Sequence, residues 1–307
     1  MSTTSRTTRV AEVGASCFTG ALVIGITNPL DSLKQRWQVE PPSSVSIFTF
    51  SRKIVQHEGL MRGLWLPGVA SNICACTISV GTRLGLYPML RDFLQPPSQR
   101  SSAGMFASGL LGGALGYIAS APFFAATRIM QAEAGALSTD GKFYVTGARK
   151  GLPPTVGSSN GMAMLSHLVA ERGILGQWRG SEILVARGAI MSATQLATYD
   201  AGKARLKALG FTDGPLVHCG ASLAASLTLT TAICPFDVTY TAFLAGPSLG
   251  RPYANPMAAA QKLVQEGGAT ALFRGWTPLW LRFLPSSVLT FLIYEQSRRV
   301  LLGAYLD

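Results

Sequence analysis

The chain has 307 residues, of which 48% are hydrophobic and only 13% charged, and its net charge is +11. Soluble globular proteins carry about 25% charged residues, so this composition argues against a soluble protein and favours helices that lie in lipid. The basic residues form no run with interleaved aromatics. We therefore attribute the positive charge to anionic lipid head groups and expect no nucleic-acid partner.

Six apolar runs follow one another along the chain, and each is long enough to cross a bilayer, which takes roughly 17–25 residues. They cover residues 11–30, 67–90, 103–126, 182–201, 215–240 and 276–294. The even number of runs places both termini on one side of the membrane. More than half of the 26 Lys and Arg residues lie in the long loops after the first, third and fifth runs. The positive-inside rule places these loops in the more negative compartment.

One sequence pattern occurs three times in the same order. The odd-numbered runs end in motifs that begin with proline: Pro29-Leu30-Asp31-Ser32-Leu33-Lys34, Pro122-Phe123-Phe124-Ala125-Ala126-Thr127 and Pro235-Phe236-Asp237-Val238-Thr239-Tyr240. An acidic residue, an aromatic residue and a glycine follow each motif: Glu58, Trp65 and Gly68; Glu171, Trp178 and Gly180; Glu266, Phe273 and Gly275. A tyrosine lies 19 residues after each glycine: Tyr87, Tyr199 and Tyr294.

A fixed internal period indicates one structural unit that is used three times. The period of about a hundred residues is too long for one turn of a solenoid, so the unit is a pair of long helices. We therefore predict an all-α membrane protein with six transmembrane helices in a single domain over residues 1–307. Repeat 1 covers residues 10–97, repeat 2 covers residues 103–207 and repeat 3 covers residues 214–304.

The motif prolines predict how the helices close one end of the bundle. A proline inside an apolar helix removes a backbone hydrogen bond and kinks the helix, so three equivalent kinks bring three helix ends together. Asp31 and Lys34 lie three residues apart on one face, where they can pair with acids and bases of neighbouring helices. A second pattern at the ends of the even helices predicts another gate. Its residues are Tyr87 and Arg91; Tyr199, Asp200 and Lys203; Tyr294, Glu295 and Arg298.

These motifs resemble those of the mitochondrial carriers over nearly the whole chain. In that family the odd helices carry Pro-x-Asp/Glu-x-x-Lys/Arg, a short matrix-side helix with an acid and a glycine follows, and the even helices carry Phe/Tyr-Asp/Glu-x-x-Lys/Arg. The resemblance implies a six-helix, pseudo-threefold barrel in the mitochondrial inner membrane, with one central site and alternating access. It also implies a monomer with cardiolipin at the matrix-side helix ends.

Repeats 2 and 3 depart from the family's motif at the matrix-side gate. The acid and base positions of repeat 2 hold Phe124 and Thr127, and the base position of repeat 3 holds Tyr240. If neighbours pair as in the family, Asp31 faces Thr127 and Phe124 faces Tyr240. The only ion pair left at this gate then joins Lys34 to Asp237.

Two further expectations follow from the family's gates. Gln38 and Gln131 stand where the family places a glutamine brace beneath an ion pair. At the cytoplasmic gate Arg91 would pair with Glu295 and Asp200 with Arg298, while Pro88 leaves Lys203 without an acid. One ion pair against two predicts a resting preference for the matrix-open state.

Three arginines lie inside the predicted membrane helices, where charge is costly and marks a functional site. Arg187 and Arg282 both lie twelve residues before their repeat's tyrosine, so we place them at one depth on two helices. Arg83 lies roughly 12 Å nearer the other gate, as judged from helical rise. Two guanidinium groups at one level and a third above it suit a small dianion, because arginine binds carboxylate or sulfate through paired hydrogen bonds.

In carriers that resemble this chain, the depth of Arg187 and Arg282 is the substrate contact level. Arg187 and Gly188 look like the contact pair of keto-acid and dicarboxylate carriers, and Phe283 follows the arginine of repeat 3. The equivalent pair in repeat 1, Ala75 and Cys76, is smaller and less polar than usual, which favours a bulkier or less polar anion. We expect the substrate contacts to be Arg187, Gly188, Arg282, Phe283, Ala75, Cys76 and Arg83.

Several strings are similar to the oxaloacetate carrier branch of the family, among them Thr82-Arg83-Leu84-Gly85 and Ser192-Ala193-Thr194-Gln195-Leu196. The sequence therefore predicts a secondary transporter of small dianions, oxaloacetate-like or sulfate-like, and no enzyme. An uncoupling-type proton or anion leak and a carrier-shaped scaffold without transport are the alternatives. The five cysteines have no metal-ligand spacing, and we expect no metal and no cofactor.

Overall fold

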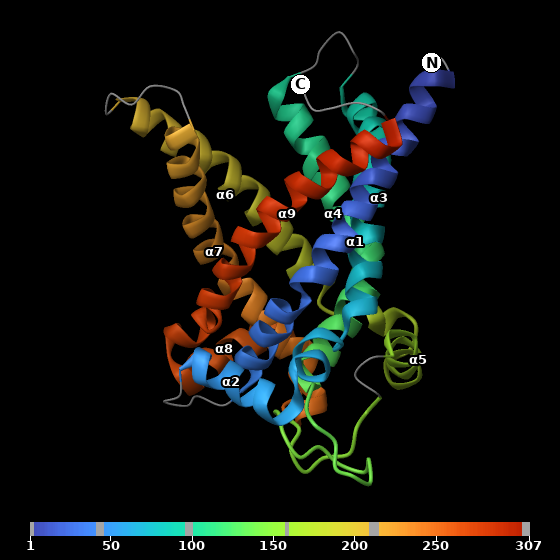
Figure 1. Ribbon diagram of the computed structural model, residues 1–307, viewed down its shortest axis with the longest axis vertical. Helices are drawn as coiled ribbons and strands as arrows, with labels where there is room; N and C mark the ends of the chain where they lie inside the picture. Colours follow the sequence, from blue (N-terminus) through green and yellow to red (C-terminus); the bar gives the residue numbers. More distant parts are fainter. Residues whose placement is uncertain (1–2, 41–45, 96–100, 157–159, 209–214, 303–307) are drawn as a thin grey trace.

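The computed structural model describes residues 3–40, 46–95, 101–156, 160–208 and 215–302, most of which are helical (Figure 1). The long helices are α1 (Thr3–Val39), α3 (Val69–Leu94), α4 (Ser102–Glu133), α6 (Ser181–Ala208), α7 (Pro215–Ala245) and α9 (Trp276–Leu302). A short helix stands between the two long helices of each repeat: α2 (Ile47–Glu58), α5 (Gly161–Arg172) and α8 (Pro256–Gly267). The predicted fold of six long helices in three pairs is confirmed.

Four helical stretches within the described residues are long and apolar enough to cross a membrane: Glu12–Val39, Met61–Leu94, Ala103–Glu133 and Leu223–Ala245. The other two long helices, α6 and α9, have comparable lengths of 28 and 27 residues. Arg187 and Arg282 lie in their first halves. Charged side chains on membrane helices generally face the protein interior.

The long helices form a ring in the order α1, α3, α4, α6, α7 and α9, and α9 contacts α1 again. Figure 1 shows them converging toward the end that carries α2, α5 and α8, which we call the short-helix end, and spreading apart toward the chain termini. The helices α1, α4 and α7 also contact one another. Each contains its motif proline, Pro29, Pro122 or Pro235, in its interior, where the missing N–H group allows the helix to bend.

A glycine precedes the second long helix of each repeat (α3, α6 and α9) and allows that repeat to pack closely against another. Gly68, Gly180 and Gly275 have φ angles of 63°, 84° and 91°, a left-handed conformation that only glycine adopts without strain. A Cβ atom on Gly68 would lie 3.2 Å from the carbonyl oxygen of Thr127 in α4. The corresponding positions on Gly180 and Gly275 lie 3.2 Å from Tyr240 in α7 and 3.1 Å from Gln38 in α1. The three repeats therefore share one packing contact as well as one sequence pattern.

A hydrogen bond between Thr146 and Glu58 attaches the short-helix end of repeat 2 to that of repeat 1, and a buried ion pair within each repeat lies beside it. Both terminal nitrogens of Arg36 donate to Glu58, at 2.5 and 2.6 Å, and both side chains are about 3% exposed. The hydroxyl of Thr146, in the loop between α4 and α5, donates to the same carboxylate at 2.6 Å. At the start of that loop Glu133 lies 3.2 Å from Arg149. This loop is therefore fastened to both repeats beneath the bundle.

Candidate functional site

A polar cavity of about 140 Å³ lies inside the ring of helices. Its charged residues are Asp31 of α1, Arg128 of α4, Arg187 of α6 and Arg282 of α9. Amide, thiol, aromatic and aliphatic side chains complete its lining: Asn72, Gln131, Thr127, Cys76, Tyr117, Phe124, Ile24, Leu184 and Met191. The cavity therefore combines a cationic cluster with a partly apolar wall.

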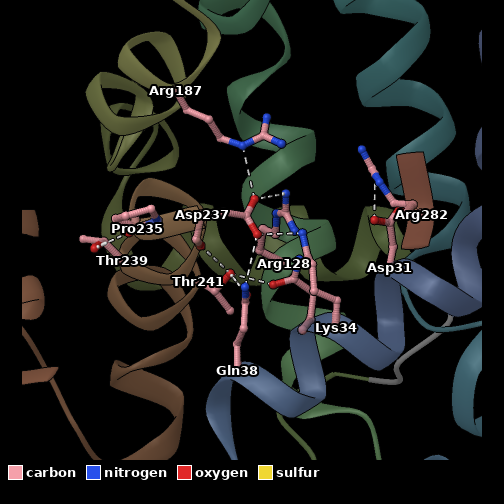
Figure 2. Close-up of polar contacts among 11 residues, drawn as sticks. Asp31, Lys34, Gln38, Arg128, Arg187, Pro235, Asp237, Thr239, Thr241 and Arg282 are labelled. Atoms are coloured by element: carbon pink, nitrogen blue, oxygen red, sulfur yellow. Dashed lines mark hydrogen bonds and ion pairs between the residues drawn. The ribbon is translucent and has the colours of Figure 1, made fainter. Parts of the chain in front are cut away.

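Asp237 of α7 is the centre of the larger of two ion-pair groups (Figure 2). Its carboxylate is fully buried and lies 2.6 Å from the amine of Lys34, 3.3 Å from Arg128 and 3.2 Å from Arg187. The amide of Gln38 donates to it at 3.2 Å. The expected Lys34–Asp237 pair and the expected brace by Gln38 are thus present, together with two arginines that the motif does not predict.

Asp31 forms the second group with Arg282, whose Nη1 donates to its carboxylate at 2.7 Å. The expectation that Lys34 and Asp237 form the only ion pair at this gate is therefore wrong. Thr127, the expected partner of Asp31, donates its hydroxyl to the carbonyl of Phe123 on its own helix at 2.8 Å. A buried carboxylate needs a cation, and Arg282 supplies one from α9 because repeat 2 has none at the base position.

The cluster carries more positive than negative charge. In these contacts four cations, Lys34, Arg128, Arg187 and Arg282, meet the two carboxylates of Asp31 and Asp237, which leaves two positive charges in excess. The Nε atom of Arg282 and one oxygen of Asp31 are buried without a hydrogen-bond partner. Buried charges are costly unless they are compensated, so the chemistry of this cluster suits an anion.

Gln131 does not brace an ion pair. Its amide donates to the side-chain oxygen of Asn28 at 3.0 Å, and Asn72 donates to the same oxygen at 3.2 Å. Asn28 in turn donates to the carbonyl groups of Trp65 and Pro67, at 2.6 and 3.1 Å. The amide of Gln131 therefore belongs to a buried network between α1, α3 and α4.

The two aromatic gate residues, Phe124 and Tyr240, belong to the same apolar cluster, in which Tyr240 is buried and Phe124 packs against it. Phe124 lies beside Tyr117, with ring centroids 6.1 Å apart. Tyr240 is buried beneath Arg128, whose guanidinium carbon lies 5.9 Å from the ring centroid. Tyr240 therefore supports one of the cations that hold Asp237.

The expected contact residues of repeat 1 divide into two groups. Cys76 lines the cavity, whereas Ala75 is fully buried in helix packing and lies outside the cavity lining. Arg83 follows Cys76 by two helical turns on α3, is exposed, and also lies outside this lining. Consecutive helical residues point about 100° apart, and here the rotation of α3 turns Cys76 rather than Ala75 toward the cavity.

Gly188 and Phe283 lie next to the cavity arginines along the chain. A Cβ atom on Gly188 would overlap the ring of Tyr117, so Gly188 holds that ring rather than lining the cavity. The guanidinium carbon of Arg282 lies 5.7 Å from the ring centroid of Phe283. Phe283 packs on the apolar cluster of α7 and α9 that contains Ile233 and Leu279.

The expected cytoplasmic gate is described only in part. Tyr87 and Tyr294 are half-buried, and Arg91 lies 2.9 Å from Asp92 on its own helix. The other expected gate side chains lie outside the described part of the structure: Tyr199, Asp200, Lys203, Glu295 and Arg298.

Sequence reasoning missed Arg128, Asn28, Asn72 and Tyr117. Thr127 occupies the base position of repeat 2, and Arg128 is the next residue. A basic residue directly beside a motif position that lacks one could have indicated the role of Arg128. Asn28 and Asn72 are polar residues in apolar runs, where buried polar groups need partners. Nothing in the sequence singled out Tyr117.

Comparison with known proteins agrees with this architecture. The family described as "Mitochondrial carrier protein" matches residues 5–98, 98–209 and 212–305. The chain is 30% identical over 298 residues to the mitochondrial 2-oxoglutarate/malate carrier protein of Bos taurus, covering 92% of this chain and 89% of the relative. It is 25% identical over 304 residues to mitochondrial uncoupling protein 5 of Arabidopsis thaliana, covering 89% and 92%. These names do not support the expected oxaloacetate branch.

Proposed function

The chain belongs to the mitochondrial carrier family, whose repeat covers it three times, and on this premise we propose that it transports small dianionic metabolites. Members of this family are multi-pass proteins of the inner membrane that move metabolites and are not enzymes. Dicarboxylates of the size of malate, 2-oxoglutarate or oxaloacetate are the proposed substrates, with sulfate as an inorganic counterpart. The names of the 2-oxoglutarate/malate carriers among its relatives favour this class.

The excess of two positive charges in the cavity is the observation that carries the proposal. Arg187 and Arg282 reach the cavity from two different helices, so the two carboxylates of one substrate can each find a guanidinium group. A monoanion would leave one buried cation uncompensated. A dianion removes the whole excess, and arginine binds carboxylate groups through paired hydrogen bonds.

The same arginines also connect the substrate to the gate. Arg282 holds Asp31 and Arg187 holds Asp237, so a substrate that binds these arginines competes with two gate carboxylates. Each substrate carboxylate can replace a protein carboxylate without leaving the arginine unpaired. A ligand moves a conformational equilibrium only through its different affinity for the two states. Here the difference comes from gate carboxylates that lose a partner when the substrate binds.

An uncoupling-type leak is the second candidate, because relatives named as uncoupling proteins match most of the chain. The two functions differ in a measurable way. A dianion carrier moves labelled malate or 2-oxoglutarate into proteoliposomes that contain unlabelled dianion, whereas a leak dissipates a proton gradient without such a counter-substrate.

The test is uptake of labelled malate, 2-oxoglutarate, oxaloacetate, sulfate and phosphate by purified protein in proteoliposomes, beside a fluorescent measurement of proton conductance. Dianion uptake that requires internal dianion supports the proposal. Proton conductance without any anion uptake would replace it with the leak.

A further inference from the structure

An aromatic wall on α4 faces the cavity, and it consists of Tyr117 and Phe124. The two rings are tilted by 48° with their centroids 6.1 Å apart, and Tyr117 is half-buried. The cavity beside them holds about 140 Å³, well below the roughly 300–1,000 Å³ of pockets for drug-sized ligands. The rings of Tyr117 and Phe124 are part of the wall that limits this space.

Gly188 of α6 fixes the position of that wall. Three atoms of the Tyr117 ring lie where a side chain on residue 188 would begin, so the ring packs directly on the backbone of α6. The residue before Gly188 is Arg187, one of the proposed substrate partners. A carboxylate bound to Arg187 would therefore lie next to the ring of Tyr117.

We propose that Tyr117, held against Gly188, sets the upper length of the dianion that fits between Arg187 and Arg282. This inference rests on the proposed function, because it assumes that both arginines bind the substrate. The ring occupies volume beside Arg187, and a longer chain between the two carboxylates has to pass it. Removal of the ring then admits longer dianions, and a methyl group at residue 188 pushes the ring toward the cavity and excludes them.

A structural role for Tyr117 predicts a different result. If the ring only packs α4 against α6, its removal weakens uptake of all dianions by the same factor and leaves their order unchanged. A length limit changes the order. The relative affinity for short and long dianions therefore separates the two roles even when a variant is less stable.

The experiment measures competition with labelled malate uptake in proteoliposomes by linear saturated dicarboxylates of four to eight carbons. The variants are Tyr117→Ala, Tyr117→Phe, Gly188→Ala and the double variant Tyr117→Ala with Gly188→Ala. Gly113→Ala is the matched control, since Gly113 lies one turn before Tyr117 and an added Cβ there meets nothing within 4 Å.

In Tyr117→Ala, the eight-carbon diacid should compete with malate more strongly relative to the four-carbon diacid than it does in the parent. The expected gain is about ten- to a hundredfold, the range for a small change in pocket size. Gly188→Ala alone should make short diacids better competitors relative to long ones. The same substitution in the Tyr117→Ala background should leave the ranking of the diacids unchanged. Tyr117→Phe and Gly113→Ala should keep the parental order. An unchanged order in Tyr117→Ala overturns the inference alone, whereas absence of dianion uptake by the parent overturns the proposed function with it.

Discussion

Arg282 of α9 donates a hydrogen bond of 2.7 Å to Asp31 of α1, and the contact joins the last helix of the chain to the first. Asp31 belongs to the proline motif of repeat 1, whereas Arg282 lies at the proposed substrate level of repeat 3. One arginine therefore serves the gate and faces the cavity. The motif carboxylate and the cavity are therefore connected directly in this chain.

Replacement of Arg282 by Ala should abolish dianion uptake, because loss of one partner of a desolvated charge pair costs about 2–5 kcal/mol or more. It also leaves the buried carboxylate of Asp31 without its partner, which should lower the free energy of unfolding by about 3–5 kcal/mol. Arg282→Ala combined with Asp31→Asn should recover stability but not uptake. Thermal unfolding and proteoliposome uptake measure the two effects.

Arg187→Ala is the matched comparison. Asp237 keeps Lys34 and Arg128 when Arg187 is removed, so stability should fall less than in Arg282→Ala while uptake is still lost. Normal uptake by either correctly inserted single variant would place the substrate site elsewhere.

Replacement of Arg128 by Gln should change the preferred charge of the substrate. It reduces the excess in the cluster from two positive charges to one, so a monoanion becomes the better match. Hydrogen bonds to charged groups contribute about 1.5–3 kcal/mol, so uptake of malate relative to lactate should fall roughly ten- to a hundredfold. Arg128→Lys keeps the charge and should keep the preference. An unchanged ratio in Arg128→Gln would contradict the charge argument.

Replacement of Thr127 by Lys restores the family's base opposite Asp31. The new amine should compete with Arg282 for that carboxylate and shift the balance between the two open states. The shift should be small, because ion pairs whose charges are desolvated contribute little net free energy. Labelling of single cysteines in the cavity from each side of the membrane measures it, with Thr127→Gln as the uncharged control. Equal labelling in the parent, Thr127→Lys and Thr127→Gln would show that Asp31 does not take part in the gate.

A larger side chain in place of Cys76 should have a different effect from a larger side chain in place of Ala75. Cys76→Gln adds volume to the cavity lining, so it should weaken competition by alkyl-substituted dicarboxylates about ten- to a hundredfold relative to malate. Ala75→Tyr should instead destabilise the protein by about 1–3 kcal/mol through overpacking, because Ala75 is fully buried. Cys74→Gln, at an exposed position of the same helix, should change neither quantity. A changed substrate order in Cys74→Gln would indicate that α3 is rotated.

Gly68→Ala should destabilise the ring more than Gly250→Ala does. Both glycines have the left-handed helical conformation, in which a non-glycine residue costs roughly 1–2 kcal/mol. Only at Gly68 does the added Cβ also meet the backbone of Thr127, at 3.2–3.3 Å, whereas nothing lies within 4 Å at Gly250. Thermal unfolding in detergent measures the difference. Equal losses would show that the contact between repeats is dispensable.

The fold and part of the gate could be predicted from the sequence because they repeat. Three copies of one motif specify helix pairs, and Lys34 and Asp237 occupy the base position of one copy and the acid position of another, which meet when neighbouring repeats pair as in the family. The rotation of each helix about its own axis does not follow from a repeat. Thr127 and Arg128 point about 100° apart, and only the packed structure shows that the second of them reaches Asp237.

The expected preference for the matrix-open state was based on motif residues alone. It counted one ion pair at the matrix-side gate, whereas Arg282 with Asp31 and two arginines on Asp237 add to it. These partners come from positions that the family motif does not include. When a motif position lacks its usual charged residue, residues outside the motif can pair with the remaining motif residues. Whether they do so depends on distances in the folded protein, which the spacing along the sequence does not give.

The ring of helices has a consequence for the synthesis of the protein. The first helix leaves the ribosome long before the last, because chains are made from the N-terminus. Until α9 is made, α1 lacks one of its two neighbours in the ring, and Asp31 lacks the arginine that compensates its charge. The contact between Asp31 and Arg282 can therefore form only after nearly the whole chain has been made, and the last helix completes the surroundings of the first.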